Sequence, residues 1–224
     1  MTAPAATASP RHRAGPAGGG ARRLLALLLA LLAAPAPADT LDAVLARMAA
    51  DQPHHYRYRE VRYLQLLEDA FEARGDLFVA TQRLLIVQRS PRPLLIRIGP
   101  ARLLYLDPDN GVRRVQVVDD STELPGITPL LRFFRAGHDR DRLQRYFEVR
   151  FEDRDGRWRL HLEPRATSAV QDMEVTGPDG GGPDRIRLRF DDGDHTRWFL
   201  TALSHGEQAE REMQAMAEAG NAAP

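Results

Sequence analysis

Three segments in the second half of the chain alternate between apolar and charged residues almost without error. They cover residues 147–152, 157–162 and 185–190. Side chains on a β-strand point to opposite faces of the sheet in turn, so this alternation predicts strands with one apolar face and one solvated face. Something must cover the apolar face, and the sequence contains too few helical segments to cover it generously.

The first strand expected in the chain changes its phase. Tyr56 and Tyr58 alternate with arginines, but after Glu60 the apolar positions move to Val61 and Tyr63. A slip of phase inside a strand usually marks one extra residue, so we expect a β-bulge after Glu60.

Turn residues separate the other strands of the first half. Apolar runs within residues 77–87, 94–98 and 103–106 are followed by Asn110-Gly111 and a returning segment at 112–117. Asn-Gly accepts the positive φ angles of a tight hairpin, so it predicts that the last two of these strands pair. The whole chain then holds about nine to eleven short antiparallel strands, which favours a single curved sheet or a partly open barrel.

Helical spacing occurs at three places. Residues 41–48 follow a capping Asp39-Thr40, and residues 128–136 are the most apolar helix candidate, followed by a short helical turn up to residue 147. The predicted fold class is therefore mainly β, a curved antiparallel sheet that forms an incomplete barrel and is covered by helices that act as a lid. Residues 206–224 predict a weakly helical or disordered C-terminal tail.

The first 38 residues have the three parts of a secretory signal peptide. Four arginines precede an apolar run at 24–34 that is too short to span a bilayer, and Ala36-Pro37-Ala38 offers a cleavage site of small residues. An uncleaved membrane anchor is the alternative. Cleavage leaves a domain at 39–205 and the tail at 206–224, and it places the mature protein in the periplasm.

Charge and composition exclude several functions. Loss of the four leader arginines changes the balance to 27 basic against 31 acidic residues, which argues against nucleic-acid binding. Lysine is absent, so Schiff-base chemistry and a phosphate-loop lysine are excluded. Cysteine is absent as well, so the chain has neither disulfides nor a cysteine-linked lipid anchor, and we expect a monomer that is not embedded in a membrane.

Motifs for catalysis or metal binding are weak. The loop that starts at Asp107 echoes a calcium loop, but its twelfth position is Val118 instead of glutamate. Ser204 and His205 are neighbours on a strand end and would point apart, and no nucleophile elbow is present. The arginines at 185, 187 and 189 fit the solvated face of a strand better than a binding stripe. We expect no metal, no cofactor, no catalytic residue and no enzyme.

At this point the order of landmarks resembles the LolA family of periplasmic carriers of outer-membrane lipoproteins, and more closely its LolA-related branch. The resemblance extends from Leu41 to about Leu203. It rests on the first helix, the strand pair at 94–106, the helices at 128–147, and four motifs. These are Tyr58-Arg59-Glu60-Val61-Arg62-Tyr63-Leu64, Phe71-Glu72-Ala73-Arg74-Gly75-Asp76-Leu77, Trp158-Arg159-Leu160-His161-Leu162-Glu163-Pro164 and Asp192-Gly193-Asp194-His195-Thr196.

The resemblance implies an apolar cavity for acylated lipoprotein or lipid cargo, with an inner-membrane donor and an outer-membrane acceptor. The lid is expected at 128–136, with Gly126 and Gly137 as its hinge. The apolar residues expected to line the cavity and lid are Tyr56, Tyr58, Leu77, Val79, Leu94, Ile96, Ile98, Leu130, Phe133, Phe134, Phe147, Val149, Phe151, Trp158, Leu160, Leu162, Ile186, Leu188, Phe190 and Trp198.

One departure from the family concerns cargo release. The family's carriers place an arginine before a proline at the end of the second strand, and this chain has Thr81-Gln82 there, with Arg83 one position on. Three other functions stay open on the sequence: an outer-membrane barrel, a periplasmic hydrolase or isomerase that uses the same pocket, and a binding or assembly module without lipid-transfer activity.

Overall fold

The computed structural model describes residues 39–66, 68–119, 122, 128–136 and 139–222, and the predicted signal peptide at 1–38 lies outside them. In the described residues eleven antiparallel strands form one sheet. The strands are β1 (His54–Tyr63), β2 (Phe71–Ala80), β3 (Arg83–Ser90), β4 (Leu94–Ile98), β5 (Arg102–Asp107), β6 (Val112–Val117), β7 (Phe147–Arg154), β8 (Arg157–Pro164), β9 (Val170–Pro178), β10 (Arg185–Phe190) and β11 (His195–His205).

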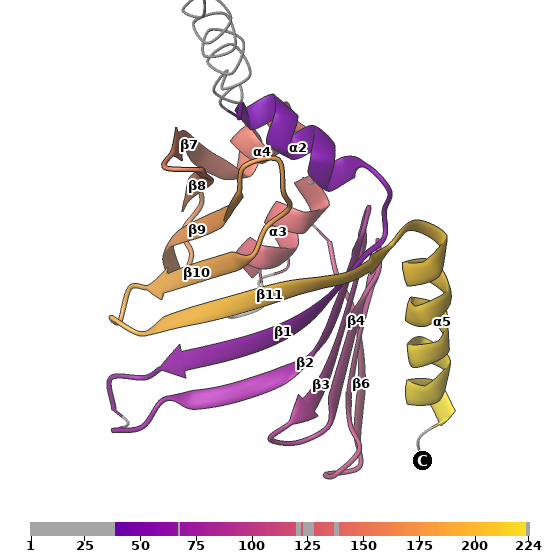
Figure 1. Cartoon of the computed structure of the whole chain (residues 1–224). Coiled ribbons are helices and arrows are strands. Elements are labelled where there is room, and N and C mark those ends of the chain that lie inside the picture. The colour runs from indigo at the N-terminus through magenta and orange to yellow at the C-terminus, as the bar shows by residue number, and fades with distance from the viewer. Residues whose placement is uncertain (1–38, 67, 120–121, 123–127, 137–138, 223–224) are drawn as a thin grey trace, which may run out of the picture. The chain divides into compact units, whose positions relative to one another are not determined.

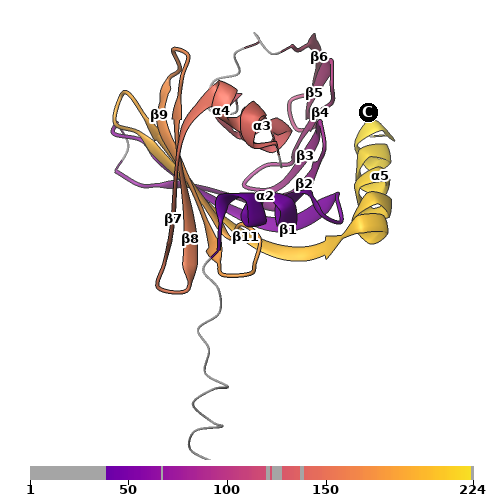
Figure 2. The ribbon, with the colours of Figure 1, turned by 90° about the horizontal axis from the view of Figure 1, so that it is seen from above.

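The sheet is an open, curved one. Its strand order is β6-β5-β4-β3-β2-β1-β11-β10-β9-β8-β7, so pairing of β1 with β11 joins the two halves, and β6 and β7 form the two edges. Figure 2 shows the sheet bending around α3 and α4. An incomplete barrel covered by helices, as predicted from the alternation of residues, is therefore confirmed.

Three helices lie on the concave side of the sheet, which we call the inner face: α2 (Leu41–Ala49), α3 (Thr128–Ala136) and α4 (Arg140–Tyr146). The hydroxyl of Thr40 accepts the amide of Ala43 at 3.2 Å and caps α2, and Asp139 caps α4 in the same way. The main apolar core lies between these helices and the sheet.

A fourth helix, α5 (Gly206–Ala222), packs on the convex side, which we call the outer face (Figures 1 and 2). Its Met213 is buried against Phe78, Leu85 and Leu104, which point outward from β2, β3 and β5. Residues 206–222 thus cover a second, smaller core. The consecutive apolar runs of β2 to β5 are explained by this helix, because both faces of these strands are buried.

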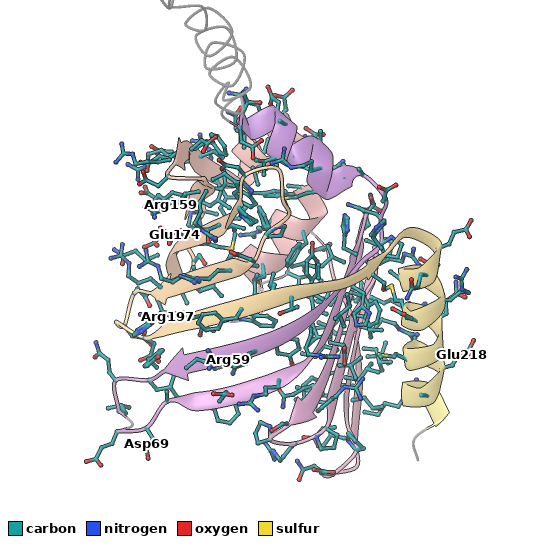
Figure 3. All side chains as sticks on the ribbon, in the orientation of Figure 1. Arg59, Asp69, Arg159, Glu174, Arg197 and Glu218 are labelled. Atoms are coloured by element: carbon teal, nitrogen blue, oxygen red, sulfur yellow. The ribbon has the colours of Figure 1, made fainter. Side chains whose placement is uncertain are left out.

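The alternating segments place their side chains as predicted. Trp158, Leu160 and Leu162 point inward from β8 and are fully buried. The arginines of β10 lie on the outer face, where Arg187 pairs with Glu174 and Arg189 with Asp172. Charged side chains continue along this face on neighbouring strands, as the labelled Arg159, Glu174, Arg197 and Arg59 show in Figure 3.

The expected bulge after Glu60 is wrong. Pairing of β1 with β11 is regular from Tyr56 to Tyr63, and the register shift lies between His55 and Tyr56. Glu60 therefore keeps its place on the inner face, and it is 4% exposed. The apolar phase changes because polar residues occupy the inner face at the end of the strand.

Candidate functional site

A cavity of about 420 Å³ opens between the inner face of the sheet and α3. Strands from both halves of the sheet form its floor and walls, and Leu130 and Phe134 of α3 form its roof. Its lining residues are Tyr58, Glu60, Arg62, Leu64, Leu77, Leu84, Ile86, Gln88, Leu94, Ile96, Leu130, Phe134, Ala169, Leu188, Phe190, Asp192, Asp194, Thr196 and Trp198. We call this space the inner cavity.

The inner cavity has one polar end. Glu60 accepts two hydrogen bonds from the guanidinium of Arg62, at 2.7 and 3.0 Å, so its buried carboxylate is neutralised within the same strand. Arg62 also lies over the ring of Phe71. Asp192 and Asp194 approach from the turn between β10 and β11, and Asp194 accepts the backbone amide of Gln65 at 2.8 Å.

Two aromatic side chains on the cavity wall carry polar atoms without a partner. Tyr58 and Trp198 come from the paired strands β1 and β11 and stack with their ring centroids 4.7 Å apart. Within the described part of the chain, no group forms a hydrogen bond with the buried Tyr58 Oη or Trp198 Nε1. Burial, with the nearby charge of Glu60, raises the pKa of Tyr58 far above its usual range, so its hydroxyl stays protonated.

The predicted ligand-binding residues fall into two groups. Nine of the twenty line the inner cavity. These are Tyr58, Leu77, Leu94, Ile96, Leu130, Phe134, Leu188, Phe190 and Trp198. The others pack in the core beside it: Tyr56, Val79, Ile98, Phe133, Phe147, Trp158, Leu160, Leu162 and Ile186 are buried, and Val149 and Phe151 are half-buried.

Sequence reasoning missed the polar end of the inner cavity as part of a site. Glu60 and Arg62 lie two and four residues after Tyr58 in β1, so their side chains point to the same inner face. This spacing of two could have identified them from the sequence. The predicted lid at 128–136 corresponds to α3, whereas its proposed hinges, Gly126 and Gly137, lie outside the described residues.

A second concavity, of about 460 Å³, lies on the outer face between α5 and β4 to β6. Leu104, Met213 and Ala217 form part of its apolar lining, and arginines of β3 to β6 stand around it. Arginine stems commonly cover apolar surface while their charges stay in water. The inner cavity is the better candidate site, since it alone of the two has buried polar atoms without a partner on its wall.

A polar cluster also ties α5 to the outer face. His55 Nε2 lies 2.9 Å from Asp76 Oδ1, and His55 Nδ1 lies 2.8 Å from Glu212 Oε2. Ser204 donates to the same Glu212 oxygen at 2.6 Å, and Arg89 donates to Asp76 at 2.6 Å. His55 is 6% exposed and its ring stacks on Phe78, so the centre of this cluster is shielded from water.

The same cluster places serine, histidine and aspartate in one chain of contacts. Ser204 Oγ is 3.5 Å from His55 Nδ1, but that nitrogen faces Glu212 at shorter range. Both ring nitrogens of His55 therefore lie within hydrogen-bond distance of a carboxylate, Nε2 of Asp76 and Nδ1 of Glu212. Ser204 donates to Glu212 and not to the histidine, so the geometry is that of contacts that hold α5 on the sheet.

The segment in which the LolA family has an arginine before a proline forms the turn between β2 and β3. Thr81 donates its hydroxyl hydrogen to Gln52 at 2.6 Å, and Gln82 adopts a positive φ of 60°. Arg83 points to the outer face and forms two hydrogen bonds with Glu210 of α5, at 2.8 and 3.0 Å. The shifted arginine therefore contributes to the attachment of α5 and not to the inner cavity.

No family model and no curated protein matches the sequence. Among solved structures, the chain is similar to a LolA superfamily protein from Nitrosomonas europaea, with 12% identity, a TM-score of 0.42, and coverage of 73% of this chain and 92% of that chain. It is also similar to an uncharacterized conserved protein from Thermus thermophilus, with 8% identity, a TM-score of 0.47, and coverage of 76% and 90%.

A third similar structure is the lipoprotein LppX from Mycobacterium tuberculosis, with 13% identity, a TM-score of 0.32, and coverage of 72% of this chain and 95% of that chain. A LolA superfamily protein is thus among the solved structures that this chain resembles. Identities and TM-scores this low leave the function to be argued from the geometry of the chain. Within the described residues, no helix has the length and apolar character needed to cross a membrane.

Proposed function

We propose that this protein is a periplasmic carrier that binds the acyl chain of a lipoprotein or of a related lipid in the inner cavity and delivers it towards the outer membrane. The observation that supports the proposal is the open apolar cavity of about 420 Å³ between the sheet and α3. Ligand sites in proteins commonly measure about 300–1,000 Å³ and are lined mainly by apolar residues with a few polar groups.

The energetics of lipid transport explain why such a cavity is useful. Each methylene that is exposed to water costs about 0.8 kcal/mol, so an acyl chain of about 16 carbons costs about 13 kcal/mol. A carrier has to offset most of this cost and still release its cargo. A cavity roofed by one short helix meets both needs better than a fully packed core would.

The proposal predicts that lipid co-purifies with the protein. Protein purified from the periplasm without detergent is extracted with organic solvent, and the extract is analysed by mass spectrometry. Delipidated protein is then tested for binding of a long-chain acyl ester. Absence of acyl lipid in the extract, together with absence of binding, would contradict a carrier function.

A variant that narrows the inner cavity supplies the structural test. Ala169 is exposed at the cavity wall, so Ala169→Trp should place a large side chain over the opening without disturbing the core. We expect acyl ester binding to fall at least about tenfold, the equivalent of about 1.4 kcal/mol. Ala166→Trp is the matched control, because Ala166 is exposed in the same loop and does not line the cavity.

A further inference from the structure

The unpartnered polar atoms of Tyr58 and Trp198 have a specific consequence for the ligand. Tyr58 is 1% exposed and Trp198 is 5% exposed, and both side chains line the inner cavity. In native proteins the large majority of buried polar groups form hydrogen bonds, so two neighbouring exceptions on one cavity wall require an explanation. Trp158, the other tryptophan of the chain, follows the rule, since its Nε1 donates to the carbonyl of Gly181 at 3.1 Å.

The chemistry of the two atoms limits what can bind them. Indole Nε1 is a donor only, and the protonated hydroxyl of Tyr58 is available as a second donor. A carbonyl oxygen has two lone pairs and can accept from both. A protonated amine could not be bound by Trp198, because an ammonium group has no lone pair to accept a hydrogen bond.

Charge at the same end of the cavity separates neutral from anionic ligands. Glu60 is paired with Trp198 across the two strands, and its carboxylate is buried. Arg62 already donates two hydrogen bonds to Glu60, so its charge is balanced within the protein. A free carboxylate at this point would add an unpaired negative charge beside Glu60, which is unfavourable in a buried site.

We propose that Tyr58 and Trp198 form a carbonyl-binding pair, which makes the inner cavity selective for acyl chains with a neutral carbonyl, that is, esters or amides, over plain hydrocarbons and free fatty acids. The proposal rests on the acyl-carrier function given above and narrows its ligand class. The hydrocarbon part of the ligand contacts the apolar wall, while the carbonyl oxygen accepts hydrogen bonds from Trp198 Nε1 and Tyr58 Oη.

A competition experiment tests the pair. Delipidated full-length mature protein is equilibrated with equimolar methyl dodecanoate, tridecane and dodecanoate, freed of unbound ligand by gel filtration, and extracted for gas chromatography with mass spectrometry. We expect the wild type to retain about ten times more ester than either competitor, a preference typical of one or two hydrogen bonds. Tyr58→Phe and Trp198→Phe should each reduce several-fold the ratio of retained ester to retained tridecane, because each removes one hydrogen-bond donor to the carbonyl.

The control is Tyr63→Phe, which removes a hydroxyl from the outer face of the same strand, where Tyr63 stacks on His195. Its ester preference should equal that of the wild type. Comparable retention of ester and hydrocarbon by the wild type, or stronger retention of dodecanoate, would overturn the carbonyl-binding pair and leave the carrier function standing. Retention of none of the three ligands would overturn both the pair and the carrier function.

Discussion

Glu212 should make a pH-dependent contribution to stability, because it connects α5 to the sheet through His55 and Ser204. Its carboxylate accepts hydrogen bonds from Ser204, Gln208 and His55, in order of their effect, and these lower its pKa from 4.5 to about 2. One pKa unit corresponds to about 1.36 kcal/mol, so the shift has an upper limit of about 3 kcal/mol. The side chain is 35% exposed, and solvent screening reduces this to about 1–2 kcal/mol.

The direction of this pH dependence follows from the difference between the pKa of Glu212 in the folded state and in the unfolded state. The folded state holds Glu212 with a depressed pKa, so its stabilising effect is complete above pH 4.5 and is lost as the pH falls towards 2. Glu212→Gln should therefore lower the free energy of unfolding by about 1–2 kcal/mol at pH 7 and by progressively less between pH 4.5 and 2. Urea unfolding followed by circular dichroism at several pH values measures this difference.

The matched control is Glu218→Gln, at an exposed site on the same helix, where the side chain points away from the sheet in Figure 3. It should change stability by less than about 0.5 kcal/mol at every pH. An equal loss in both variants, or a Glu212→Gln difference that stays constant down to pH 2.5, would refute the contacts of Glu212 with Ser204, Gln208 and His55 as the origin of the effect.

Two further predictions concern packing. A Cβ at Gly75 would lie 2.0 Å from the carbonyl oxygen of Val87, so Gly75→Ala should lower the free energy of unfolding by about 3 kcal/mol, measured with heat or urea. The control is Gly99→Ala, which should cost far less because the nearest atom to its Cβ would be 3.7 Å away. Similar losses in both variants would contradict the backbone clash. Met213→Ala should lower the free energy of unfolding by about 2–4 kcal/mol in the same assay and increase proteolysis within α5. An unchanged unfolding midpoint would show that the outer core does not hold this helix.

The second half of the sheet could be predicted closely because its signal is local. In β8, Trp158 and every second residue after it face the core, and the residues between them face water. The residue type at each position therefore indicates whether that position is buried or solvated. The pairing of β5 with β6 around Asn110-Gly111 was predicted as well, but only Gly111 takes the positive φ, of 60°, that was expected of both residues. Strands with one buried face leave a pattern with a period of two, and turn residues mark where each strand ends. A curved sheet follows from strands of this kind.

The role of α5 could not be predicted from its own sequence, because the helix is mostly polar and alanine-rich, with few buried residues such as Met213. The missing signal was in the strands. Leu84 and Leu85 are consecutive and both buried, one in the inner core and one in the outer core. Continuous apolar runs indicate strands that are covered on both faces. The runs in β2 to β5 therefore predict a helix on the outer face of the sheet.

The inner cavity could be predicted as an apolar space but not in its polar detail. Glu60 suggested a bulge because an acid at an inward position is rare without a partner. Its partner, Arg62, lies two residues away on the same face, where a strand brings side chains of one face close together. The orphaned Nε1 of Trp198 depends on what packs around it in three dimensions, and no sequence pattern reports that.

In the proposed carrier, the outer face of the sheet would serve stability and the inner face would serve binding. On the outer face, Met213 and the ion pair of Arg83 with Glu210 attach α5 to strands that also form the cavity wall. This attachment strengthens β2 to β5 without filling the inner face. Strands that are anchored from outside can tolerate an incompletely packed concave side, since the cost of the open space is offset by contacts that ligand entry does not disturb. A change that loosens α5 should therefore weaken the protein without altering its preference among ligands, whereas a change at Tyr58 should do the reverse.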